Sequence, residues 1–305
     1  MTTATVPVPP KTPTPTVITR APRRWKLSDR SLVRALLTDK VGIAGAVLVV
    51  IVAAAAVFAP VLAPYDPTAM SSVRLSPPNA IFLLGSDEAG RDLLSRAIFG
   101  ARSSLSVGLT VIFFSTIIGV ALGLLAGYYR GFLDGLTMRV MDILFAFPTL
   151  LLALAVVAVL GTAMENLILA LVIVFIPTFA RVARASAITL ANEPFVESAR
   201  AIGAKDSHIL FRYILPNALA PIAVQVSISL AYVILTEAAL GYLGLGVQPP
   251  AASWGSMLAS GKAFIELSIW PSLVPGMCIF IAVLGFNLLG DALRDAMDPR
   301  LRSRG

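Results

Sequence analysis

The stretch SSLSVGLTVIFFSTIIGVALGLLAGYY, residues 103–129, contains no charged side chain and is long enough to cross a lipid bilayer as one helix. A helix needs about 20 predominantly apolar residues to span the hydrocarbon core. An uncharged run of this length is improbable in a water-soluble domain, so the stretch predicts an integral membrane protein.

Five further segments between charged residues are expected to span the membrane in the same way. The weakest is 166–183, because only 15 residues separate Glu165 from Arg181. At 1.5 Å per residue these give about 22 Å, less than the ~30 Å core, so Arg181 and Arg184 would have to reach toward the headgroups. The predicted fold is an all-α integral membrane protein with six transmembrane helices, at about 41–63, 103–129, 143–164, 166–183, 218–240 and 272–290.

Composition and charge agree with this class of protein. Of the 305 residues, 57% are hydrophobic and 13% are charged, against roughly 45–50% and ~25% in soluble domains. The net charge is +7, and the segments expected in the cytoplasm hold 19 of the 24 Lys and Arg residues. Because positive charge collects on the cytoplasmic side, we expect both termini there, and we expect no nucleic-acid partner.

The predicted organisation has three parts. Residues 1–40 form a cytoplasmic N-terminal tail, disordered at its Pro- and Thr-rich start because such a segment cannot bury a core. Residues 41–290 form the six-span domain, and residues 291–305 form a cytoplasmic C-terminal tail. Between spans four and five lies a cytoplasmic loop, 184–217, far longer than the two to eight residues that join most neighbouring helices.

This long loop contains the signals of a short helix. Asn192 is the expected N-cap, and Pro194 fits the first turn, where its missing N–H costs little. Gly203 can adopt the left-handed conformation after the last turn. The helix is therefore predicted to be about ten residues long, which is too short to be stable alone.

Phe195, Ala199 and Ile202 give the expected helix an apolar stripe, at positions i, i+4 and i+7. Because a short helix with such a stripe needs a partner, we expect it to dock against another molecule. The alternative is an ordinary surface helix.

The loop resembles the EAA loop of the membrane subunits of ABC importers, whose pattern is E-A-A-x3-G-x9-I-x-L-P. Ser198 replaces the second-position alanine and Tyr213 replaces the isoleucine. The residues that match in position, and that the resemblance assigns to coupling with an ATPase, are Glu197, Ser198, Ala199, Gly203, Leu215 and Pro216.

Other stretches are similar to the peptide/opine/nickel branch of this family, and in particular to the C-type subunit of dipeptide and oligopeptide permeases. The resemblance covers roughly residues 30–300, and Ala252 stands where that branch often has proline. The stretches are LGSDEAGRDLLSRAIFGARSSL (84–105), MDILFAFPTLLLAL (141–154), EAALGYLGLGVQPPAASWG (237–255) and LGDALRDAMDPR (289–300).

The resemblance implies the ABC importer type I permease fold and a transport subunit of the bacterial inner membrane that is not itself an enzyme. The implied partners are a homologous permease subunit, forming a heterodimer, two cytoplasmic ABC ATPase subunits and an extracytoplasmic substrate-binding protein. ATP and Mg²⁺ would be bound by the ATPases, so no cofactor is expected in this chain. The implied cargo is dipeptides or oligopeptides, and nickel, opines or glutathione-like molecules are the alternatives.

Glu237 is the one acidic residue inside a predicted span, and ionisable groups within a membrane are often functional. Counting from Ala218 places it near the outer interface. Two interpretations stay open: a structural hydrogen-bond partner, or a polar group at the outer gate or substrate path. A secondary transporter or channel would be expected to carry more buried charge than Glu237 alone.

A glycine pair imitates a phosphate-binding loop, because four residues separate Gly85 from Gly90. Arg91 and Asp92 follow where Lys and Ser/Thr are required, so no nucleotide site is predicted. The segment from Asp92 to Arg102 is expected to form an interfacial helix.

Gly119, Gly123 and Gly127 recur every four residues, the spacing that allows close helix approach, and are expected to pack against another subunit. The single histidine, His208, and the single cysteine, Cys278, are interpreted as structural.

Overall fold

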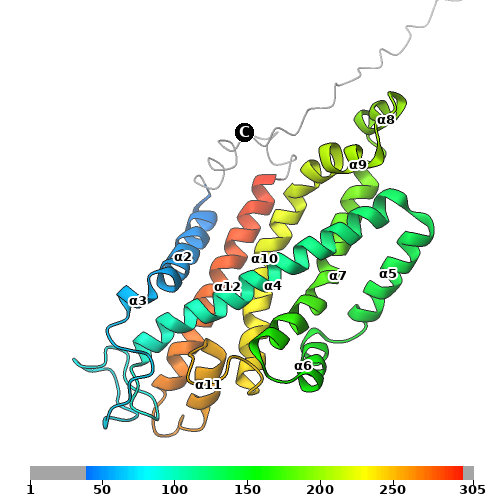
Figure 1. Cartoon of the computed structure of the whole chain (residues 1–305). Helices are drawn as coiled ribbons and strands as arrows, with labels where there is room; N and C mark the ends of the chain where they lie inside the picture. The colour runs from blue at the N-terminus through cyan, green and yellow to red at the C-terminus, as the bar shows by residue number, and fades with distance from the viewer. Residues whose placement is uncertain (1–38, 298–305) are drawn as a thin grey trace, which may run out of the picture.

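The computed structural model describes residues 39–297, and the fold is built from α-helices (Figure 1). Within that range the only β-type pairing is an isolated bridge between Ser86 and Asp92, so the all-α prediction is confirmed. The elements are α2 (Lys40–Val57), α3 (Ala59–Leu62), α4 (Leu93–Tyr129), α5 (Gly131–Phe145), α6 (Thr149–Leu160), α7 (Met164–Leu190), α8 (Pro194–Ala201), α9 (Asp206–Ile209), the π-helix η1 (Leu210–Ile214), α10 (Leu215–Tyr242), α11 (Trp254–Lys262) and α12 (Trp270–Met297).

Both predicted tails lie largely outside the described residues. At the N-terminal side Asp39 caps α2, accepting hydrogen bonds from the backbone N–H groups of Val41 and Gly42 at 3.1 and 2.9 Å. At the other side α12 continues to Met297, so residues 291–297 are the last turns of a helix.

Five helical segments are long and apolar enough to cross a membrane, or six if the bent pair α5 and α6 counts as one span. The predicted span 143–164 is wrong as a single helix, because α5 ends at Phe145, α6 begins at Thr149, and the two meet at 90°. The break contains Pro148, which has no N–H to donate and disfavours a helical conformation in the preceding residue.

Helix α4 begins at Leu93, well before the predicted start of span two. Asp92 caps it by accepting hydrogen bonds from the backbone N–H and the hydroxyl of Ser95, at 2.8 and 2.7 Å. The segment 92–102 is therefore not a separate interfacial helix. Its Leu93 and Ala97 are buried in a small cluster with Met257 of α11 and other apolar residues.

Helices α4 and α7 approach each other backbone to backbone. A Cβ added to Gly123 would lie 2.2 Å from the carbonyl oxygen of Ala180, and Gly119 and Gly127 are similarly close to α7. Small residues permit this separation, which larger side chains would prevent. The prediction that the three glycines pack against another subunit is wrong, because they face α7 of the same chain.

Helix α7 continues well beyond Arg181, and two ion pairs hold this part of it to α5. Arg181 Nη2 lies 2.6 Å from Asp142 Oδ1, and Arg184 Nη2 lies 2.7 Å from Asp134 Oδ2. The two arginines expected to reach toward headgroups are thus paired within the chain.

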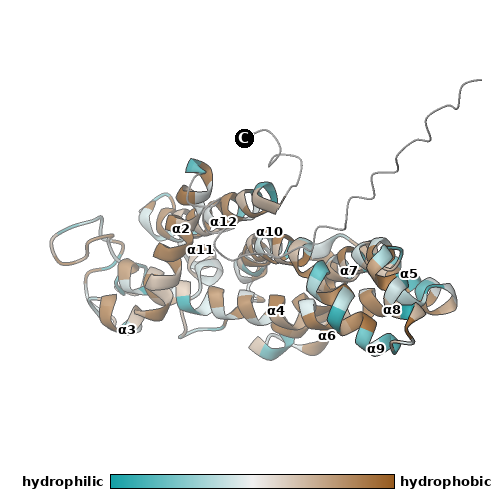
Figure 2. Ribbon diagram, turned by 90° about the horizontal axis from the view of Figure 1, so that it is seen from above, coloured by the Kyte–Doolittle hydropathy of each residue, from teal (hydrophilic) through white to brown (hydrophobic). Residues whose placement is uncertain are grey.

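The bundle has two distinct ends, which we call the α8 end and the α11 end. Figure 1 shows α8 and α9 at the top of the bundle and α11 at the bottom, with α10 running between them. Helix α10 continues the run that begins at α9, so Asp206–Tyr242 forms one candidate span. Seen from above in Figure 2, hydrophobic residues dominate the long helices, and hydrophilic residues appear on α8 and α9.

We expect Gly123→Leu to destabilise the chain by about 1–3 kcal/mol or more, because there is no space for the side chain beside the Ala180 carbonyl. The measurement is the thermal midpoint of purified protein in detergent. Gly135→Leu is the matched control, since no atom lies within 4 Å of a Cβ added to Gly135 on α5. Equal midpoints for the two variants would contradict the packing described.

Candidate functional site

Helix α8 stands at the end of the bundle, directly after α7. Pro194 occupies its first turn, and the N-cap residue is Glu193. The prediction of Asn192 as N-cap is wrong, because its side chain is engaged at the end of α7. It donates to the carbonyl of Ile188 at 2.9 Å and accepts from Arg130 Nη2 at 3.3 Å.

The end of α8 is a Schellman motif built around Gly203. This glycine adopts the left-handed conformation expected from the sequence, with φ of 77°. Its N–H donates to the carbonyl of Arg200 at 2.9 Å, and the N–H of Ala204 donates to the carbonyl of Ala199 at 3.0 Å. No atom lies within 4 Å of an added Cβ, so glycine is needed here for its backbone conformation and not for space.

The buried face of α8 differs from the predicted stripe. Val196 and Ala199 are buried in the main core, and Phe195 packs beside the Tyr213 ring with the centroids 6.3 Å apart. Ile202 is 83% exposed, because the helix ends at Ala201 and the chain turns away at the next residues. Ile202 is therefore uncovered within this chain, and its expected contact with another molecule stays a prediction.

The opposite face of α8 is open to a partner. Glu197 and Ser198 are exposed there, and the Ser198 hydroxyl donates to the carbonyl of Pro194 at 2.8 Å, so it is satisfied within the helix. Two large apolar side chains are also exposed at this end, Ile202 on the turn and Phe211 on η1, which is 72% exposed. An exposed surface that combines apolar and charged groups in this way is typical of a protein-binding site.

Helix α9 is held against the end of α4. The Tyr128 hydroxyl donates to Asp206 Oδ1 at 2.7 Å, and the Arg200 guanidinium lies 5.1 Å from the centroid of the Tyr128 ring. The ring of His208 contacts Tyr213 edge-on at 5.7 Å. These contacts fix the position of α8 relative to the long helices.

The residues that match the EAA-loop pattern lie on consecutive helical segments of the chain, from α8 to the start of α10. Leu215 and Pro216 form the first turn of α10, where Pro216 needs no hydrogen-bond acceptor and Leu215 packs on the core. The path runs from α8 through the Gly203 turn, α9 and η1 into α10.

Glu237 lies on α10 near the α11 end. Its side chain is completely buried, so counting residues from Ala218 underestimated its burial. Neither carboxylate oxygen has a hydrogen-bond partner among the described residues, although the hydroxyls of Ser104 and Ser253 face the carboxylate.

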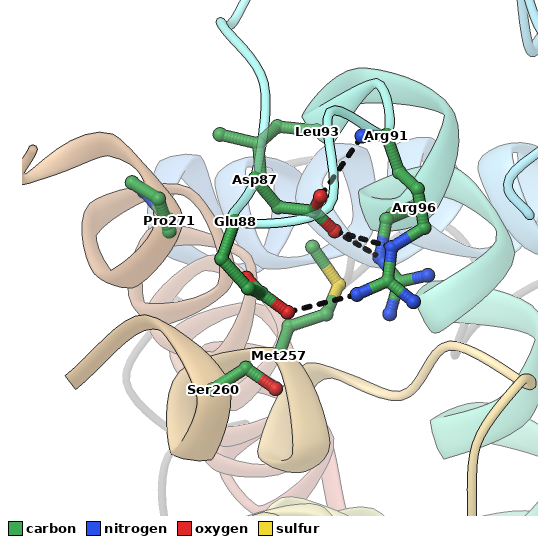
Figure 3. Close-up of a pocket in the computed structure, with 8 residues that line it drawn as sticks. All are labelled: Asp87, Glu88, Arg91, Leu93, Arg96, Met257, Ser260 and Pro271. Carbon is green, nitrogen blue, oxygen red and sulfur yellow. Dashed lines mark hydrogen bonds and ion pairs between the residues drawn. The ribbon is translucent and has the colours of Figure 1, made fainter. Parts of the chain in front are cut away.

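The glycine pair that imitates a phosphate loop belongs to an ion-pair cluster at the α11 end (Figure 3). Asp87 Oδ2 lies 2.7 Å from Arg91 Nε and 3.3 Å from Arg96 Nε, and Glu88 Oε1 lies 2.9 Å from Arg91 Nη2. The cavity between these groups is about 10 Å³, room for no more than a water molecule. A phosphate group does not fit there. The sequence alone did not reveal this cluster, although the spacing of Asp87 and Arg91 was a signal for it.

The segment before α4 is folded back onto that helix. Arg96 Nη1 donates to the carbonyl of Pro67 at 3.1 Å. Next to it, the hydroxyl and backbone N–H of Thr68 donate to Asp66 and lower the pKa of that carboxyl below its ordinary value.

Comparison with known proteins decides the family. Residues 119–303 match the model of the binding-protein-dependent transport system inner membrane component. The chain belongs to this family. Residues 30–78 also match the N-terminal transmembrane domain of oligopeptide transport permease C. The chain is therefore a multi-pass membrane subunit of a transport system, as the resemblance implied.

Curated relatives cover nearly the whole chain. The di/tripeptide transport system permease protein of Pseudomonas aeruginosa is 46% identical over 272 residues, 87% of this chain and 90% of the relative. The dipeptide transport system permease protein of Alkalihalophilus pseudofirmus is 44% identical, over 90% of both chains. The glutathione transport system permease protein of Pectobacterium atrosepticum is 43% identical, over 90% of this chain and 92% of the relative.

The fold has a solved counterpart. A structure of the MetNI methionine ABC transporter, described as inward facing, superimposes with a TM-score of 0.54 and 22% identity, over 68% of this chain and 97% of the other. This likeness shows the fold alone, and it confirms the predicted type I permease fold.

We expect Tyr128→Phe to loosen α9, because the variant loses the hydrogen bond to Asp206, worth about 1 kcal/mol or about fivefold in the local opening equilibrium. Hydrogen exchange of backbone amides in residues 204–214 is the measurement. Tyr129→Phe is the control, since in the described part of the chain its hydroxyl makes no hydrogen bond. Unchanged exchange in Tyr128→Phe would show that this contact does not hold α9.

Proposed function

We propose that this chain is a permease subunit of a binding-protein-dependent ABC importer of dipeptides and short oligopeptides. It pairs with a homologous permease subunit, and the two enclose the translocation pathway across the bacterial inner membrane. Two ABC ATPase subunits bind at the α8 end, which faces the cytoplasm together with both termini. A substrate-binding protein delivers peptide at the α11 end.

The exposed face of α8 is the observation that carries this proposal. A short helix at the tip of the bundle, with Glu197, Ser198 and Ile202 uncovered, offers a surface for a second protein. The basic residues Arg130, Arg200 and Lys205 belong to the same end, and positive charge next to the spans favours a cytoplasmic location.

The proposed mechanism couples the ATPases to the spans through α8. ATP and Mg²⁺ are bound by the ATPase subunits, and their closure displaces α8. Since α8 continues through the Gly203 turn into the helical run Asp206–Tyr242, the displacement reaches the far side of the bundle. Alternating access then follows as a shift between two packings of the helices. No covalent chemistry takes place in this chain.

Peptide cargo is favoured by the names of the relatives, which are peptide permeases, and by the match to the N-terminal domain of oligopeptide transport permease C. Glutathione is the second candidate cargo, because a glutathione permease is nearly as similar. Glutathione is itself a short peptide, so the two candidates share one chemical class.

Crosslinking tests the proposed ATPase contact. The chain has one cysteine, so Cys278→Ala gives a cysteine-free background. In native vesicles we expect Ala201→Cys, at the exposed end of α8, to crosslink to an ABC ATPase, because α8 would be seated in it. Ser260→Cys, exposed on α11, is the control and should capture no ATPase. Failure of the α8 cysteine to capture any ATPase would contradict the proposal.

We expect Gly203→Val to abolish transport while leaving membrane insertion intact. A β-branched residue at φ of 77° costs about 1–2 kcal/mol or more and would redirect α8, yet it clashes with no neighbouring atom. The measurement is uptake of labelled alanyl-alanine by proteoliposomes containing the whole complex, with unlabelled glutathione as competitor. Gly135→Val on α5 is the control. Uptake at the wild-type rate in Gly203→Val would refute the coupling role.

A further inference from the structure

The first turn of α11 rests directly on the backbone of α10. A Cβ added to Gly255 would lie 2.6 Å from the carbonyl oxygen of Ala238, and one added to Gly241 would lie 3.0 Å from the Cα of Gly255. No side chain separates the two helices at this point. A small displacement of either helix would therefore act on the other.

Trp254 holds the same turn of α11 against α4. Its side chain is 2% exposed, and its indole N–H donates to the carbonyl of Ala97 at 3.0 Å. Gly100 provides the space, since an added Cβ would lie 2.8 Å from Trp254 Cδ1. The start of α11 thus contacts two long helices that are far apart in sequence.

Glu237 lies at the centre of this junction. It directly precedes Ala238 on α10, and its buried carboxylate faces Ser104 of α4 and Ser253, the N-cap of α11. Both carboxylate oxygens and the Ser104 hydroxyl are buried without a hydrogen-bond partner among the described residues. Almost all buried polar groups in proteins are paired, because an unpaired one is costly. Ser104 and Ser253 face the carboxylate, so their hydroxyl groups are the ones that can pair with it.

The start of α11 is a favourable place for an acidic side chain. Ser253 and Ser256 form a capping box there: Ser253 Oγ accepts from the backbone N–H of Ser256 at 3.2 Å, and Ser256 Oγ accepts from that of Ser253 at 3.1 Å. The unpaired N–H groups of a first helical turn carry partial positive charge and attract acidic groups. Glu237 of α10 faces Ser253 at this turn.

We propose that Glu237 is a positioning residue that holds α11 to α10 and α4 by pairing with the hydroxyl groups of Ser104 and Ser253. We call these three residues the α11 anchor. The inference rests on the proposed function, because α10 belongs to the helical run that starts beside α8. With the anchor intact, α11 moves together with that run, and engagement of the binding protein at the α11 end is transmitted to the ATPases.

The first experiment measures the position of α11 directly. In the Cys278→Ala background, spin labels at Arg102→Cys on α4 and Ser260→Cys on α11, both exposed positions, report the distance between the helices in nanodiscs containing the whole complex. We expect a narrow distance distribution in the wild type. Glu237→Leu, which fills similar volume without polar atoms, should broaden it. Glu237→Gln, whose amide can still hydrogen-bond to the two serine hydroxyl groups, should keep it narrow.

Two further variants keep this test decisive. Ser253→Ala retains Glu237 but removes one member of the α11 anchor, so it should broaden the distribution even if Glu237→Leu fails to fold. Ser115→Ala is the matched control, because Ser115 is equally buried on α4 but donates to Val172 of α7, away from α11. Narrow distributions in both Glu237→Leu and Ser253→Ala would overturn the proposal.

The second experiment measures stimulation of ATP hydrolysis by a binding protein loaded with alanyl-alanine in proteoliposomes. We expect Glu237→Leu to reduce the stimulation ratio about tenfold, equivalent to about 1.4 kcal/mol of lost coupling, and Glu237→Gln to restore it. Ser115→Ala should keep the wild-type ratio. A reduced ratio with an unchanged interhelix distance would overturn the positioning role. If no ATPase assembles with the wild type, the proposed function fails, while the same interhelix distance, measured on this chain alone in nanodiscs, still decides on the α11 anchor.

Discussion

The close backbone contact between α4 and α7 determines where the α8 end of the molecule lies. The glycines of α4 let it lie against the Ala180 carbonyl, so the two helices run together to their ends. From there α7 leads into α8, and the end of α4 presents Tyr128 to Asp206 of α9. In a membrane, where lipid is as apolar as the side chains, such van der Waals fit replaces the hydrophobic effect as the main source of helix association. The position of the proposed docking helix therefore depends on small residues in the middle of the bundle.

The membrane class, the all-α fold and most of the long helices follow from the sequence because they depend on length and hydropathy, which are local properties. Details that depend on contacts between distant segments did not follow. Pro148 within the uncharged run 143–164 indicated a kink, but not a 90° bend that divides the span into two helices. A helix starting near Asp92 was expected, but its continuity with span two was missed, because its charged and polar first turns are covered by α11 and α12, which a count of charges along the chain does not reveal.

In the candidate site, too, features set by the local sequence were predictable and features set by distant contacts were not. The left-handed turn at Gly203 was predictable, since a helix end and a glycine suffice for it. The burial of Ala199 within this chain was not, because the sequence pattern does not show which distant segments cover a helix face. For Glu237, counting along the predicted span gave only its position along the helix and could not reveal its burial. That burial comes from α4 and from α11, whose start at Trp254 lies beyond the predicted span and folds back against it.

The helical run Asp206–Tyr242 begins beside an exposed surface at the α8 end and finishes in a tightly packed contact at the α11 end. At the α8 end, backbone hydrogen bonds fix the Schellman turn, and the face of α8 that points away from the bundle is exposed. Docking of the proposed ATPase subunit requires such an exposed face. At the α11 end, contact is backbone to backbone around a buried acid, so little relative movement is possible without breaking it. The helical run Asp206–Tyr242 can transmit a displacement of α8 only if its other end is firmly packed against the rest of the bundle. Burying the Glu237 carboxylate is costly to stability, and a rigid attachment at that end is a physical reason for a transporter to keep it.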